Sequence, residues 1–153
     1  MMNGMFKHIL VPIDDSPLSI KAAKYAARLA RSSRSRLTAL HVIPSFKILA
    51  GIDGVVADPE LYSPVAYRKS TEAYARKLLA KVEAIAKASR VKCEGVFVTG
   101  DEPWRAIIKA ARGRRCDLVV MASHGRRGIA AVLLGSETTK VLTHSKVPVL
   151  VCR

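Results

Sequence analysis

Five apolar runs alternate along the chain with segments in which hydrophobic residues recur at helical spacing. Four of the runs are continuously apolar, which is typical of parallel strands that are buried on both faces. The third run places Val96 and Val98 among polar neighbours and therefore predicts a half-exposed strand near an edge of the sheet. The predicted strands cover residues 8–13, 37–42, 91–98, 118–122 and 148–152.

Helix-start signals mark the segments between these runs. Ser16 and Pro17 supply an N-cap and a first-turn proline, and a basic stripe at helical spacing follows them. A similar start at residues 101–103 predicts a helix that ends at Gly113 as its C′ residue, with Trp104, Ile107, Ile108 and Ala111 buried. We predict further helices over about residues 67–89 and about 136–144.

This alternation implies right-handed crossovers between parallel strands. We predict an α/β fold: an open, doubly wound, five-stranded parallel sheet with helices on both faces, Rossmann-like, with strand order 3-2-1-4-5. A chain of 153 residues fits one domain, and we expect residues 1–153 to form it. The long connection 44–66 is the exception to this compact plan, and a lid, part of an interface and a poorly ordered connection all fit its composition.

The formal net charge of +14 has two interpretations, a polyanionic partner or a solvated basic surface. The chain has one tryptophan, four tyrosines and three phenylalanines, which are dispersed and form no stacking platform. The basic residues are spread along the predicted helices rather than clustered. We therefore do not expect nucleic acid to be the main partner.

The cellular location is predicted from three absences in the sequence. No apolar run reaches the roughly 18 residues that a membrane helix needs, and the first residues lack the layout of a signal peptide. Cys93, Cys116 and Cys152 show no Cys-x-x-Cys spacing, which favours reduced thiols over a disulfide framework or a zinc site. These features predict a cytoplasmic protein that does not interact with membranes.

The apolar run that ends at Ala122 leads directly into a basic, glycine-rich loop. Gly135 and Ser136 then precede a predicted helix. A helix N-terminus favours anions, and glycines let the backbone approach a phosphate. Arg126 and Arg127 add positive charge in the same loop. This arrangement predicts a binding site for the phosphates of a nucleotide.

A second polar segment, Asp14-Asp15-Ser16, follows the first predicted strand. Ligands of open parallel sheets bind outside the carboxyl ends of strands, so this segment and the glycine-rich loop would face one crevice if the first and fourth strands are neighbours. Asp14 could instead cap the first helix, but its position favours ligand contact. For His41 and His124, packing or orientation of the backbone is the better interpretation than catalysis.

Four segments together carry a family resemblance: residues 9–14, His41-Val42, Ser123-His124-Gly125 with Gly135-Ser136, and residues 147–151. Through them the chain resembles the universal stress protein family over almost its whole length. That family's nucleotide-binding pattern is Gly-x2-Gly-x9-Gly-Ser/Thr. Its spacing is intact here, with Ala122 at the first glycine position. Extended backbone at this strand end would tolerate the alanine methyl, so we expect ATP binding to be retained.

The resemblance implies an ATP site with a divalent metal, such as Mg²⁺, beside the phosphates; no metal ligand is assigned. Residues near adenine and ribose would be Pro12, Ile13, Asp14 and the backbone around Val42, with Met121 and Ala122 flanking the nucleoside. The phosphates would be surrounded by Gly125, Arg126, Arg127, Gly135, Ser136, Glu137 and Thr138. The family's final strand pairs across a homodimer two-fold axis, and residues 149–152 fit that role.

Sequence signatures of the common nucleotide-using enzymes are missing. The chain has no Gly-x4-Gly-Lys-Ser/Thr, no Gly-x-Gly-x-x-Gly and no Ser/His/Asp ordering or metal-spaced His/Glu pair. We assign no catalytic residue and expect an ATP-binding, homodimeric stress-response regulator without strong catalytic activity. The alternatives are a stress protein that acts through protein partners without binding ATP and a slow ATPase of the same fold.

Overall fold

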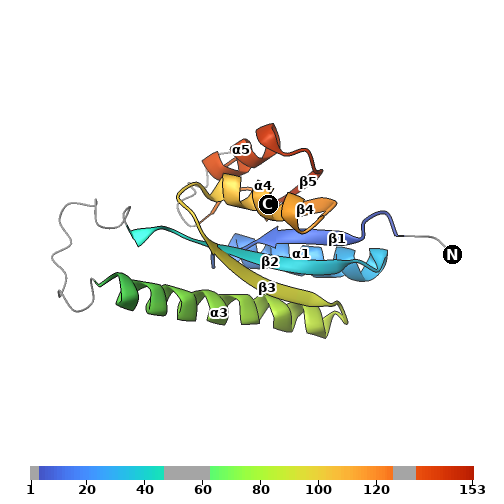
Figure 1. The fold of residues 1–153 in the computed structure, drawn as a ribbon. Coiled ribbons are helices and arrows are strands. Elements are labelled where there is room, and N and C mark those ends of the chain that lie inside the picture. Colours follow the sequence, from blue (N-terminus) through green and yellow to red (C-terminus); the bar gives the residue numbers. More distant parts are fainter. Residues whose placement is uncertain (1–3, 47–62, 126–133) are drawn as a thin grey trace.

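The computed structural model of the chain describes residues 4–46, 63–125 and 134–153. A five-stranded parallel sheet with the order β3-β2-β1-β4-β5 forms its centre, which confirms the predicted α/β fold and strand order (Figure 1). The strands are β1 (His8–Pro12), β2 (Arg36–Ile43), β3 (Cys93–Thr99), β4 (Leu118–Ala122) and β5 (Val149–Cys152). The helices are α1 (Pro17–Ser33), α3 (Pro64–Ala88), α4 (Pro103–Gly113) and α5 (Ser136–His144).

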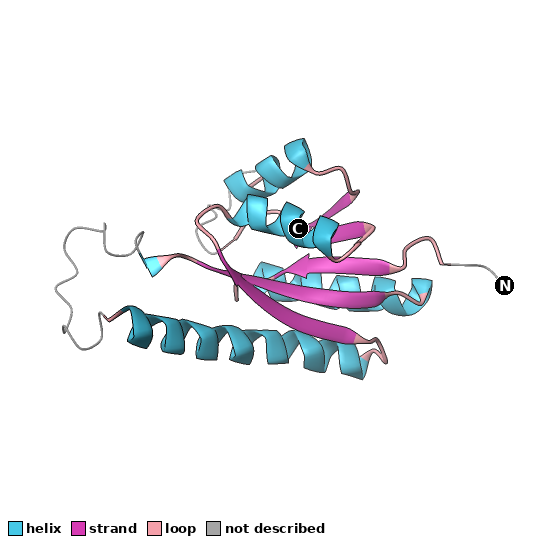
Figure 2. Cartoon of the chain, in the orientation of Figure 1, coloured by secondary structure: helices cyan, strands magenta, loops and turns pink. Residues whose placement is uncertain are grey.

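Helices cover both faces of the sheet, with α1 and α3 on one face and α4 and α5 on the other (Figure 2). Because successive side chains of a strand point to opposite faces, β1 contributes to two separate cores. Ile9 and Val11 pack in the core with α1 and α3, whereas Leu10 packs with Ile107 of α4 and Val141 of α5. The half-exposed β3 lies at one edge, as predicted, and β5 lies at the other.

Small side chains bring α1 close to the sheet. The alanines on its inner face are fully buried, and because a methyl group is short, the helix axis can approach the strands. Ser16 caps the helix by accepting a hydrogen bond from the Ser19 amide at 3.1 Å, and Pro17 occupies the first turn. The predicted start of this helix is therefore confirmed.

Two other helix boundaries differ from the prediction. Helix α3 begins at Pro64 rather than near Tyr67, because Ser63 caps it by accepting from the Ala66 amide at 3.0 Å. Part of the expected connection 44–66 is thus helical, and residues 47–62 of it lie outside the described ranges. Gly113 is the last residue of α4 and not its C′ residue; the left-handed conformation falls instead on Arg115, with φ 54°.

Fewer residues of α4 are buried than predicted. Ile107 and Ala111 are buried against the sheet, but Trp104 and Ile108 are only partly buried. Trp104 still packs against the core that contains Leu10 and Ile107, whereas Ile108 is not part of that core. Among the described residues, no helix is long and apolar enough to cross a membrane.

Candidate functional site

The carboxyl ends of the strands meet at one edge of the sheet, where backbone hydrogen bonds continue just beyond the ends of β1 and β4. The Ile13 amide beyond β1 donates to the Leu40 carbonyl at 2.8 Å, and the Ser123 amide beyond β4 donates to the Cys152 carbonyl at 2.7 Å. Strands β1 and β4 are neighbours, as the crevice prediction required. The loops after these two strands therefore lie beside each other.

Asp14 and Gly125 bring the two predicted loops into contact. A β-carbon at position 125 would collide with the Asp14 carboxylate, so only glycine fits there without movement of that side chain. Asp14 Oδ1 also accepts a hydrogen bond from the Ser16 amide at 3.1 Å. Ser16, and not Asp14, is the N-cap of α1. The Asp14 carboxylate thus orients the loop and faces the glycine-rich segment.

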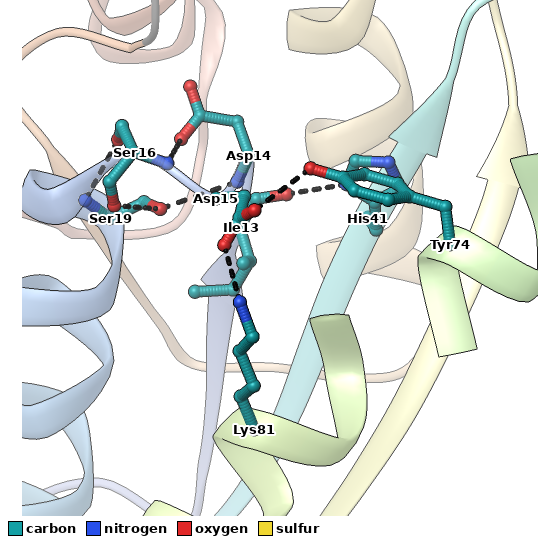
Figure 3. Close-up of polar contacts among 8 residues, drawn as sticks. All are labelled: Ile13, Asp14, Asp15, Ser16, Ser19, His41, Tyr74 and Lys81. Carbon is teal, nitrogen blue, oxygen red and sulfur yellow. Dashed lines mark hydrogen bonds and ion pairs between the residues drawn. The ribbon is translucent and has the colours of Figure 1, made fainter. Parts of the chain in front are cut away.

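A polar cluster from α3 holds the next residue, Asp15, in place (Figure 3). Asp15 has a left-handed backbone, with φ 66°. The Tyr74 hydroxyl donates to its Oδ2 at 3.0 Å, and Lys81 forms an ion pair with its Oδ1 at 3.0 Å. These contacts offset the cost of the left-handed conformation and anchor the loop that carries Asp14.

His41 completes this cluster from the side of β2. Its ring Nδ1 donates to the Ile13 carbonyl at 2.8 Å, and its ring packs edge-on against Tyr74 with centroids 5.9 Å apart. The side chain is 8% exposed, which confirms the prediction of a packed, hydrogen-bonded histidine. Tyr74 and Lys81 were not predicted as site residues. Their spacing of about two helical turns places both on one face of α3, and this spacing is the sequence signal that could have indicated them.

The end of β4 is tied directly to the start of α5. The Thr138 hydroxyl donates to the Ala122 carbonyl at 2.9 Å, and the Gly135 amide donates to the Ser123 carbonyl at 2.7 Å. A β-carbon at Gly135 would lie 3.1 Å from His124 Cα, which is tighter than ordinary contact. The second glycine therefore allows a close approach of two backbone segments.

Ala122 occupies an unstrained position. It pairs with Cys152 in the parallel ladder between β4 and β5 and is buried, with 8% of its surface exposed. It is not one of the non-glycine residues with positive φ among the described residues. The extended conformation expected for this alanine is therefore present, and the methyl group costs no backbone strain.

Helix α5 presents its N-terminus at the same edge of the sheet. Gly135 is the N-cap, and no side chain within the described ranges accepts a hydrogen bond from the first-turn amides as a cap. Such amides and the helix dipole favour an anion. The Glu137 carboxylate turns away toward α4, where its Oε2 accepts from the Trp104 amide at 2.8 Å, and its Oε1 pairs with Lys140 at 3.2 Å.

The remaining predicted residues have different placements. The side chains of Ile13 and Met121 are buried in the two cores, so a ligand at this edge would meet their backbone. Pro12 and Val42 are half-buried, and Ser136 is exposed. His124 lies within hydrogen-bonding distance of the Ser123 hydroxyl, with Nδ1 and Oγ 3.1 Å apart. Arg126 and Arg127 lie outside the described residues.

In the described part of the chain, no group of three His, Cys, Asp or Glu side chains is arranged to hold a metal ion. Among the described residues, the backbone amides at the start of α5 and the Asp14 carboxylate lie at this edge of the sheet, with Gly125 and Gly135 allowing close approach. This combination suits a ligand with anionic oxygens at one end and hydrogen-bonding groups at the other.

Comparison with known proteins gives a consistent result. Residues 5–153 match the model of the universal stress protein family. The universal stress protein YxiE of Bacillus subtilis is 31% identical over 150 residues, which cover 97% of this chain and 100% of that protein.

Two solved structures are also similar. The structure of the hypothetical protein MJ0577 of Methanocaldococcus jannaschii superposes with a TM-score of 0.79 at 28% identity and covers 97% of this chain and 96% of its own. A universal stress protein solved in complex with cAMP has a TM-score of 0.68 at 24% identity, with 95% of each chain covered, and shows a shared fold.

Proposed function

The chain belongs to the universal stress protein family, and we propose that it binds ATP at the carboxyl edge of its sheet and acts as a homodimeric stress-response regulator without strong catalytic activity. Residues 1–153 would act as a single domain. Its thiols at Cys93, Cys116 and Cys152 are free, which favours a reducing compartment and supports a cytoplasmic location.

The observation that carries this proposal is the contact between Asp14 and Gly125 beside the N-terminus of α5. In this arrangement the glycine leaves room at the carboxylate, and the first-turn amides of α5 offer donors to phosphate oxygens. A carboxylate and an anion-binding helix end at one edge of the sheet suit the two chemically different ends of a nucleotide. A relative with the same fold, solved with cAMP, lends independent support.

Each predicted residue has a proposed role. Asp14 would accept hydrogen bonds from the ribose or adenine, and the backbone of Pro12, Ile13 and Val42 would flank the base. Met121 and Ala122 would border the nucleoside at the end of β4. The phosphates would meet the amides of Gly125, Ser136, Glu137 and Thr138, together with Arg126 and Arg127. Gly135, whose own amide donates to the Ser123 carbonyl, would keep the backbone close to the phosphates.

A divalent metal such as Mg²⁺ would arrive with the phosphates of ATP. Mg²⁺ keeps several waters and often uses substrate phosphates with one or two carboxylates rather than a cage of protein ligands. Among the described residues no group of three metal-binding side chains is found, so the phosphates and water would have to supply most of the ligands. When bound, the metal would neutralise phosphate charge, and the chain's own residues would bind and orient the nucleotide.

The experiment is a calorimetric titration of the purified chain with ATP and Mg²⁺, preceded by analysis of nucleotide released on denaturation. Gly135→Val is the test variant, because a branched side chain at this position meets the His124 backbone. Gly113→Val is the matched control, since a β-carbon there meets nothing within 4 Å. We expect binding by the wild type and the control and its loss in Gly135→Val.

Three outcomes would contradict the proposal. Absence of both released nucleotide and heat of binding would favour a stress protein that acts through protein partners. Multiple-turnover phosphate release well above background would favour the slow ATPase. Unchanged ATP affinity in a folded Gly135→Val variant would move the site away from this edge of the sheet.

The proposed homodimer would form through β5. Backbone groups of Pro148 and Cys152 bond to β4, so by alternation those of Val149 and Val151 face away from it. Leu150 is 44% exposed on this edge strand. Val151→Pro would remove one outward-facing donor without touching a bond to β4. We expect light scattering to report a dimer for the wild type and a monomer for the variant; a variant that remains dimeric would contradict pairing through β5.

A further inference from the structure

A shallow groove lies on the outer side of α4, on the face of the sheet opposite α1 and α3. Its volume is about 530 Å³. The residues that line it include Trp104, Arg105, Ile108, Lys109 and Arg112 of α4 and His144 at the end of α5. Nothing in the proposed nucleotide site uses these side chains.

The groove follows from the way α4 packs. Ile107 and Ala111 face the sheet and are buried. Residues four positions apart share one side of a helix, so Trp104, Ile108 and Arg112 form a second stripe that lines the groove, and Trp104 also packs against the core. Trp104 and Ile108 are partly buried and give the groove an apolar floor, and the basic side chains surround it.

The charges around this floor are unbalanced. Arg105 is paired with Glu102, with Nε and Oε2 2.8 Å apart. Lys109 and Arg112 form no ion pair with any acidic side chain in the described ranges, although both are exposed on the groove. A ligand with carboxylates would therefore meet two cations that no acidic side chain in those ranges neutralises.

Two neighbouring side chains lie against the tryptophan ring and cover part of it. The Arg105 guanidinium lies 5.0 Å from the centre of the Trp104 ring, and the His144 ring centroid lies 4.8 Å from that of Trp104. Binding of single-stranded nucleic acid relies on open aromatic faces for base stacking. The partly covered ring disfavours nucleic acid and favours a ligand that combines negative charge with aliphatic surface.

We propose that this groove is a docking site for an acidic, partly aliphatic peptide segment of a partner protein. Glutamate or aspartate side chains of the segment pair with Lys109 and Arg112, and an aliphatic side chain packs on Ile108 and on the part of Trp104 that its neighbours leave exposed. The inference goes beyond nucleotide binding, because it assigns a second surface through which the protein recognises another protein.

Trp104 gives a direct readout of this site, because it is the single tryptophan of the chain. The full chain is titrated with a short peptide in which glutamate alternates with leucine, and the tryptophan emission is followed. Two comparison probes are the same peptide with glutamine in place of glutamate and a single-stranded oligonucleotide of equal charge. We expect a saturable emission change with the acidic peptide alone, weakened by added salt.

The variant pair separates docking from general attraction by a basic protein. Lys109→Glu with Arg112→Glu reverses two charges on the groove, and Lys24→Glu with Arg28→Glu makes the same charge change on the exposed side of α1. We expect about a tenfold loss of peptide affinity in the first double variant, in line with removal of charge pairs at an interface, and a change below about twofold in the second.

Several results would overturn the proposal. One is no emission change up to about 1 mM peptide, the range of weak binding. Another is an equal loss of affinity in both double variants, which would show attraction by net charge. Tighter binding of the oligonucleotide would reassign the groove to nucleic acid. A changed oligomeric state of Lys109→Glu/Arg112→Glu in light scattering would reassign it to a second copy of the chain.

Discussion

The Asp14 carboxylate occupies the space that a β-carbon at position 125 would need, although 110 residues of the sequence lie between Asp14 and Gly125. The contact exists because β1 and β4 are neighbours in the sheet and both loops leave the same edge. It joins the acidic and the glycine-rich halves of the proposed nucleotide site. Each of the predictions below depends on a contact of this kind or on the burial of a particular side chain.

Gly125→Ala is expected to weaken ATP binding by at least about tenfold, because the new methyl group displaces the Asp14 carboxylate. The fold should be retained, since Gly125 is exposed. Calorimetric titration measures the effect, and circular dichroism checks the fold. Gly113→Ala is the control, because a β-carbon there has open space. An unaltered ATP affinity in Gly125→Ala would show that the position of Asp14 is irrelevant to binding.

Tyr74→Phe and Lys81→Met each remove one contact that holds Asp15. The ion pair is partly exposed, with side-chain exposures of 51% for Lys81 and 28% for Asp15, so each change should lower the free energy of unfolding by less than about 1 kcal/mol. We expect a larger effect on ATP, about a threefold to tenfold weaker affinity, because the loop that carries Asp14 loosens.

Lys77→Met is the matched control for this pair, since it removes an exposed charge from the same helix. Its ATP affinity and its urea midpoint should both stay close to the wild-type values. If Lys77→Met and Lys81→Met weaken ATP binding equally, the cluster around Asp15 has no specific part in the site.

His8 makes the stability of the protein depend on pH. Burial, together with the nearby Arg36 guanidinium, lowers the pKa of His8 below its ordinary value. The ring is 5% exposed; its Nδ1 donates to the Arg114 carbonyl at 3.0 Å, and its Nε2 accepts from the Thr38 hydroxyl at 2.8 Å. The folded state therefore holds His8 neutral and binds fewer protons than the unfolded state.

The stabilisation from His8 should be complete above about pH 6.5, the ordinary pKa of histidine, and should decline as the pH falls below it. Urea unfolding between about pH 7.5 and pH 5 measures this slope. His8→Gln should flatten it, while His144→Gln, a change at an exposed histidine, should not. A wild-type slope that persists in His8→Gln would assign the effect to other groups.

The thiols of Cys93 and Cys116 should react slowly in the folded protein. Burial raises the pKa of each to about 11, so little thiolate forms near neutral pH. We expect slow alkylation at about pH 8 in the native state and rapid alkylation of both residues in denaturant, with the sites located by mass spectrometry. Rapid native labelling of Cys116, which is 6% exposed, would contradict its burial.

Local signals in the sequence were sufficient for most of the fold. The continuous apolar runs predicted strands buried on both faces. The polar neighbours of Val96 and Val98 predicted that β3 is an edge strand. Ser16 and Pro17 marked the start of α1. The same signal at Ser63 and Pro64 marks the start of α3, inside the segment 44–66 that the sequence predicted as a connection. Capping and periodicity act within a few residues, so they are readable from the chain itself.

The candidate site depended on longer-range relationships. The glycine spacing predicted an anion-binding loop, but it could not show that Gly125 meets Asp14. Whether the Glu137 carboxylate faces the site or caps α4 at the Trp104 amide depends on how two helices pack. The anchoring of Asp15 by Tyr74 and Lys81 likewise requires α3 to lie beside the β1–α1 loop.

The sequence by itself determined where strands and helices form, which residues can cap them and where the backbone can approach an anion, because these properties arise from neighbouring residues. Only the tertiary structure decided which side chains meet across the sheet edge and that Ile108 lines a groove rather than the core. The physical reason is that crossovers and helix packing set contacts between distant segments, and no local pattern encodes those distances.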